Sequence, residues 1–159
     1  MIFADGVLAR RIEAAEAAIR RGCTEGQPGA AVLEAGGGVA LFLGPESPLT
    51  RAVGVGLNGP VRESELDRIE AFFRGRGARV AIELCPLADP GLLASLAERG
   101  YRPTEFDNVL VKPLTGEEKW SAQATERGCW RQSRSLLYFK LTHLRRRRPV
   151  PPAVFGTRD

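Results

Sequence analysis

The segment from Val80 to Lys112 constrains the fold most, because it reads as a strand, a helix and a second strand in succession. Its first six positions alternate between two classes of residue, as in a strand with unequal faces: Val80, Ile82 and Leu84 against Ala81, Glu83 and Cys85. Asp89 can cap the next helix, Pro90 suits its first turn, and Gly100 can close it in the left-handed conformation. An extended run begins at Tyr101. The segment therefore predicts a strand-helix-strand unit.

Two other segments have the period of an amphipathic helix. Between Asp5 and Gly22, apolar residues recur at every third or fourth position, with the charged residues on the other side: Leu8, Ile12, Ala15 and Ile19. A second helix is predicted within residues 62–77, with Ser64 as its cap. Its buried face is predicted to consist of Leu66, Ile69, Phe72 and Phe73.

Strands are predicted at residues 39–43 and 51–57, where the turn GPESP joins them into an antiparallel hairpin, after a weaker strand around residues 31–33. Helices that connect successive strands cover a sheet and make the strands that they join parallel neighbours. The element order therefore predicts an α/β fold, a mixed sheet flanked by helices.

Cysteine and histidine are too few and too scattered to suggest a metal or disulfide site: Cys23, Cys85, Cys129 and His143. We therefore expect no metal. The sequence has neither a leader-like start nor an apolar run of the roughly 18 residues that a membrane span needs. We expect a cytoplasmic protein that does not engage a membrane.

Charge divides the chain into two regions. Residues 1–114 hold 13 Lys and Arg against 15 Asp and Glu, whereas residues 115–159 hold 10 against 4. The first region is predicted to be the folded domain and, being mildly acidic, gives no reason to expect nucleic-acid binding. The second is predicted to be a poorly ordered basic tail or a non-native continuation, although Arg145–Arg148 leaves open a basic adaptor that binds nucleic acid. The apolar spacing around residues 137–144 fits a strand or a helix equally well.

The strand RAVGVGL, the helix at residues 63–76, the strand VAIELC and the passage LLASLAERGYRPTEF together resemble the GNAT superfamily of acyl-CoA N-acyltransferases. The resemblance covers residues 3–114 and implies a GNAT-like fold with acetyl-CoA as cofactor. In this family the pyrophosphate lies on bare backbone N–H groups at the start of the central helix. That implies a cofactor site at Val55, Leu57, Gly59, Arg62 and Ser64. The sequence departs from the family pattern here, because Glu63, Glu65 and Asp67 would repel a phosphate.

The resemblance also implies a proton acceptor on a strand, for which Glu83 is the candidate catalytic residue. A strand glutamate that faces solvent or pairs with an arginine is the other interpretation of Glu83. Leu96 occupies the position of the family's usual tyrosine acid, so that group is missing. Tyr101 is interpreted as a core aromatic residue and Cys85 as a small buried one.

Some GNAT proteins carry two lobes, one of which has lost the cofactor loop, and this chain resembles such a degenerate N-terminal lobe. Two functions follow. The first is acyl transfer from acyl-CoA to an unidentified amine, impaired or absent in the isolated chain. The second is a non-catalytic structural or ligand-binding lobe, whose partner is a catalytic GNAT lobe or a second copy of the chain.

Overall fold

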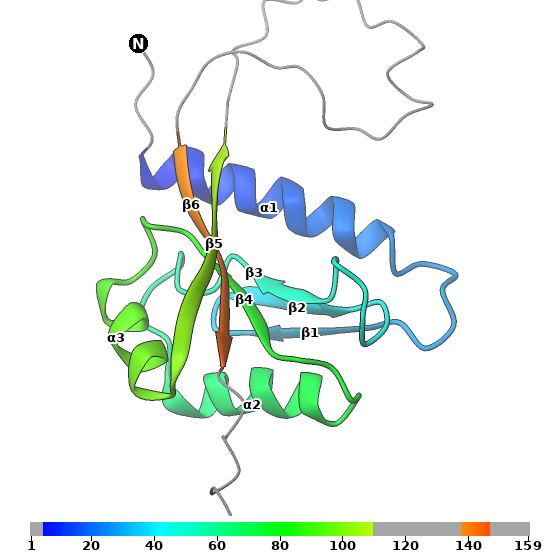
Figure 1. The fold of residues 1–159 in the computed structure, drawn as a ribbon. Helices are drawn as coiled ribbons and strands as arrows, with labels where there is room; N and C mark the ends of the chain where they lie inside the picture. Colours follow the sequence, from blue (N-terminus) through cyan, green and yellow to red (C-terminus); the bar gives the residue numbers. More distant parts are fainter. Residues whose placement is uncertain (1–4, 110–137, 147–159) are drawn as a thin grey trace, which may run out of the picture.

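The computed structural model describes residues 5–109 and 138–146. Three helices surround a six-stranded mixed sheet (Figure 1). The elements in chain order are α1 (Gly6–Gly22), β1 (Ala31–Ala35), β2 (Gly38–Phe42), β3 (Arg51–Val53), α2 (Glu63–Arg74), β4 (Ala81–Leu84), α3 (Pro90–Glu98), β5 (Tyr101–Val109) and β6 (Tyr138–Arg146). The predicted α/β class with a mixed sheet is confirmed.

The sheet has the order β1-β2-β3-β4-β6-β5. β2 and β3 pair antiparallel with Val39 opposite Val53, as the hairpin prediction requires. The predicted strand at residues 51–57 is nevertheless too long, because β3 ends at Val53. Gly54 and Gly56 follow it with φ of 71° and 77°, a left-handed conformation that interrupts a strand.

The strand-helix-strand unit does not make β4 and β5 neighbours, contrary to the prediction. β6 lies between them and pairs antiparallel with both, with Ile82 opposite Leu144 and Phe106 opposite Leu141. Residues 138–146 of the predicted tail are therefore part of the sheet, and the ambiguous apolar spacing there belongs to a strand. The rest of the predicted tail, residues 115–137 and 147–159, lies outside the described residues.

The main core lies between the sheet and the helices α2 and α3. α2 is buried along the predicted face, where Leu66, Ile69 and Phe73 are at most 1% exposed and Phe72 is 7% exposed. Burying an apolar side chain of this size contributes about 1.5–3 kcal/mol. Packing of α2 therefore supplies a large part of the stability of the fold. α1 lies on the opposite side of the sheet from α2 (Figure 1).

α1 is rotated away from the orientation that its apolar stripe predicts. Ile19 is 56% exposed and Ala15 is exposed, whereas Ala9 and Glu13 are buried. The predicted stripe is therefore only partly buried, with Leu8 and Ile12 half-buried, because charged residues on the inner side of α1 have partners on β4 and in the loop after β3. Glu13 accepts a hydrogen bond from Gly54 N at 3.1 Å, and Arg20 pairs with Glu83 at 2.8 Å.

The predicted ends of α3 are confirmed, and those of α2 only in part. Asp89 caps α3 by accepting from Gly91 N at 2.9 Å, and Gly100 follows α3 with φ of 81°. Ser64 does not cap α2, because that helix already begins at Glu63. Its cap position is Arg62, whose side chain makes no capping hydrogen bond.

Candidate functional site

The candidate site is the carboxyl end of β3 and β4, the only parallel neighbours among the described strands. Ligands of open α/β sheets bind outside the carboxyl ends of such strands. β3 and β4 share a single register pair, Ala52 opposite Ile82. The loops that leave them, residues 54–62 and 85–89, and the start of α2 therefore define the place where a cofactor would lie.

Backbone groups of the chain itself close this end of the sheet. Gly56 donates its N–H to Gly36 O at 2.9 Å and accepts from Asp89 N at 2.8 Å. Gly54 donates its N–H to the carboxylate of Glu13 at 3.1 Å. The loop after β3 is thus joined through its main-chain groups to the β1–β2 turn, to the start of α3 and to the Glu13 side chain of α1.

The structure does not bring the five predicted cofactor residues together as one exposed loop. The side chains of Val55 and Leu57 are 1% and 7% exposed and belong to the main core. Gly59, Arg62 and Ser64 are exposed on the surface near the start of α2. The side chains therefore divide into a core pair and a surface group.

Glu65 ties the first turn of α2 to the β1–β2 turn. Its carboxylate accepts from Gly36 N at 2.5 Å and from Arg68 Nη1 at 2.8 Å. The hydrogen bond from the Gly36 N–H, with a smaller contribution from Arg68, holds the pKa of Glu65 below its ordinary value despite partial desolvation. From the sequence, this carboxylate was expected only to repel a phosphate. In the structure it joins α2 to the β1–β2 turn.

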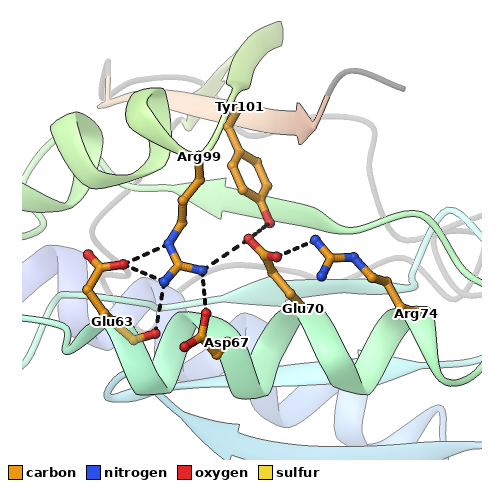
Figure 2. A network of polar contacts seen from close by, with 6 residues as sticks. All are labelled: Glu63, Asp67, Glu70, Arg74, Arg99 and Tyr101. Carbon is orange, nitrogen blue, oxygen red and sulfur yellow. Dashed lines mark hydrogen bonds and ion pairs between the residues drawn. The ribbon is translucent and has the colours of Figure 1, made fainter. Parts of the chain in front are cut away.

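Arg99, directly after α3, binds the carboxylates of Glu63 and Asp67 near the start of α2 (Figure 2). Arg99 Nε lies 2.8 Å from Glu63 Oε2, and Nη1 lies 2.8 Å from Asp67 Oδ1 and 3.3 Å from Glu70 Oε1. Burial alone would lower the pKa of Arg99, but the hydrogen bonds to the three carboxylates outweigh it and raise that pKa. Arg99 therefore remains charged and fastens α3 to α2.

Tyr101 extends this network into the core. Its ring is buried, and its hydroxyl donates to Glu70 Oε1 at 3.2 Å. Glu70 also pairs with Arg74 one turn further along α2 (Figure 2). The structure agrees with the interpretation of Tyr101 as a core aromatic residue, because its hydroxyl points at a carboxylate inside the fold.

Replacing Arg99 by methionine, which keeps the apolar stem, should lower the free energy of unfolding by about 2 kcal/mol. Glu63 and Asp67 are 62% and 68% exposed and lose little, whereas Glu70, 5% exposed, loses one of its cations. Urea unfolding measures the change. Arg11→Met, at an exposed position of α1, is the control and should change stability by less than about 0.5 kcal/mol. Equal stabilities for the two variants would contradict the role of Arg99.

Glu65 should make the fold less stable in acid. Because its folded pKa lies below its ordinary value, its contribution is present above that ordinary value and is lost as pH falls through the folded pKa. The wild type should therefore lose its stability advantage over Glu65→Gln as pH falls from about 7 to about 3. Urea midpoints at each pH test this expectation. Glu46→Gln, at an exposed position, controls for the loss of a charge. A constant difference between wild type and Glu65→Gln would refute it.

Glu83, the candidate base, lies under α1. It is 2% exposed, and its Oε1 is 2.8 Å from both Arg20 Nη2 and Arg51 Nη1. Both contacts are ion pairs between the carboxylate and a guanidinium group, and the side chain is buried beneath α1. The arrangement matches the arginine-paired interpretation. Cys85, which directly follows β4, is 2% exposed. Its sulfur accepts a hydrogen bond from Leu87 N at 3.3 Å.

A groove of about 800 Å³ runs along one flank of α1. Its apolar lining includes Ala17, Val39, Val53 and Leu57, and Arg10 and Arg21 of α1 also line it. Arg21 pairs with Glu34 at 3.0 Å across it. Sequence reasoning missed this groove, because its two walls are distant in the sequence and α1 is not oriented as its stripe predicts.

No family model matches the sequence, and neither a curated protein nor a solved structure matches the chain. The residues that the structure describes contain no cluster of His, Cys, Asp and Glu suited to a metal ion. None of the helices in that part of the chain is long and apolar enough to cross a membrane.

Proposed function

We propose that this chain is a GNAT-type lobe that does not itself catalyse acyl transfer and that serves as the structural or ligand-binding partner of a catalytic lobe. The GNAT relationship rests on the sequence passages quoted above. It gains support from the mixed sheet with a helical crossover between the parallel strands β3 and β4.

One observation carries the non-catalytic role: at the carboxyl end of β3 and β4, backbone N–H groups and the candidate base Glu83 are already bonded within the fold. Transfer of an acyl group needs free backbone N–H groups near the thioester oxygen and a proton acceptor within reach of the amine. Here the N–H of Gly54 is bonded to Glu13 and that of Gly36 to Glu65. Glu83 is paired with two arginines beneath α1.

The same contacts favour a structural lobe over a lobe whose degenerate cofactor loop still binds acyl-CoA. A phosphate at the start of α2 would compete with the Glu63 and Asp67 carboxylates for Arg99, whose ion pairs with them fasten α3 to α2. Opening the site would break this network as well as the bond between Asp89 N and Gly56 O. Acyl transfer by this chain would therefore require rearrangement of α2, α3 and the loop after β3.

Calorimetric titration of acetyl-CoA into the full chain, together with an acetylation assay on a panel of primary amines, tests the proposal. We expect neither binding in the micromolar range nor product above the uncatalysed rate. Binding with turnover that Glu83→Gln abolishes would overturn it and would favour an acyltransferase. Arg11→Gln, which removes an exposed charge on α1, is the matched control.

A further inference from the structure

We propose that α1 is a hinged lid, which leaves the sheet while the core formed with α2 and α3 stays folded. This inference goes beyond the proposed function, although opening would also release the Gly54 N–H from Glu13 of α1 and Glu83 from Arg20. Its first support is the weak apolar contact of α1. Among the hydrophobic residues of α1, Ala9 alone is fully buried, whereas α2 buries four large ones. Val7 and Ile19 of α1 are 60% and 56% exposed. Apolar burial therefore holds α1 far less firmly than it holds α2.

The inner side of α1 is charged instead. Arg20 pairs with Glu16 on its own helix and, at 2.8 Å, with Glu83 on β4, which Arg51 on β3 also contacts at 2.8 Å. Removing such groups from water costs about as much as their attraction returns. When α1 leaves the sheet, these groups regain water, so opening forfeits little net free energy.

The connection to the sheet can act as the hinge. Residues 23–30 form turns between α1 and β1, in which Gly26 and Gly29 have φ of 72° and 79°. A Cβ added to either glycine would meet nothing within 4 Å, so the segment is not wedged against neighbouring atoms. A change in its backbone angles would move α1, from which Ala9 alone contributes to the main core.

Beneath the lid lies a small apolar surface. Val39, Leu41 and Val53 form a separate cluster on this side of the sheet, and Ala17 of α1 packs against them. The groove along α1 already reaches Val39 and Val53. Opening would join the groove to this cluster and present an apolar seat flanked by Glu83 and Arg51.

Native-state hydrogen exchange of the full chain, followed by mass spectrometry, tests the lid. After correction for intrinsic rates, the amides of α1 should exchange about tenfold or more faster than those of α2. Arg20→Met should raise the exchange of α1 further and leave α2 unchanged. Arg21→Met is the matched control, because Arg21 is 45% exposed and pairs with the exposed Glu34, and it should change neither helix.

Equal protection of α1 and α2 in the wild type would overturn the proposal, as would an equal rise in both helices in Arg20→Met. If Arg20→Met prevents folding altogether, the wild-type comparison still decides. Glu16→Gln then provides the milder variant. It should raise the exchange of α1 alone, and a rise in both helices would again refute the lid.

Discussion

Removing residues 115–159 should leave a chain that does not fold, because the deletion removes strand β6 from between β4 and β5. β6 joins β4 to β5, and it pairs with β5 from Tyr101 opposite Arg146 to Val109 opposite Tyr138. Without it, β5 loses its strand partner in the sheet, and the buried strand β4 becomes an open edge. Each lost backbone hydrogen bond contributes about 0.5–1.5 kcal/mol, so the combined loss is comparable with the roughly 5–15 kcal/mol that keeps a domain folded. Circular dichroism and urea unfolding of residues 1–114 measure the outcome.

A chain that ends at Arg146 is the matched control, since it removes residues 147–159 and keeps β6. We expect a cooperative urea transition for this shorter deletion. A cooperative transition for residues 1–114 with the midpoint of the full chain would contradict the position of β6. It would restore the boundary at residue 114 that the charge distribution suggests.

Gly38→Ala should be the most destabilising single substitution at the closed end of the sheet. A Cβ at Gly38 would lie 2.3 Å from Val53 O and 2.6 Å from Val55 N, both backbone atoms. Backbone cannot move aside as a flexible side chain can, so β2 and the loop after β3 must separate. We expect a loss of about 3 kcal/mol or more in the free energy of unfolding, measured by urea unfolding.

Gly22→Ala tests the same change of residue without the contact, because a Cβ at Gly22 would meet nothing within 4 Å. Gly22 is the last residue of α1, where alanine should be neutral or slightly stabilising. Similar stabilities for the two variants would show that β2 does not approach the β3 loop as closely as the structure has it.

Local patterns predicted those elements whose residues interact with near neighbours or with a purely apolar core. Asp89 and Gly100 act at the ends of α3 within a few residues, and the apolar face of α2 needed only a hydrophobic surface to cover it. The orientation of α1 was not predicted, because it depends on the contacts that Glu13 and Arg20 make. Their partners, Gly54 and Glu83, have no signal in the sequence around α1.

The candidate site was less predictable, because its decisive contacts join residues far apart in the sequence. Glu65 meets Gly36 across 29 positions, and Arg99 meets Glu63 across 36. The sequence presents these glutamates as a cluster at a helix start, but it does not contain the information that Gly36 and Arg99 engage them. The place of β6 was hidden for the same reason, since residues 110–137 separate it from β5 in the sequence.

The chain's own contacts occupy the carboxyl end of β3 and β4. Amide chemical shifts of Gly36, Gly54, Gly56 and Asp89 in the full chain, followed during addition of acetyl-CoA, test it most directly. We predict that these four resonances do not move, even at millimolar ligand. Saturable shifts centred on them would mean that acetyl-CoA displaces the internal hydrogen bonds, and the chain would then be a cofactor-binding acyltransferase lobe.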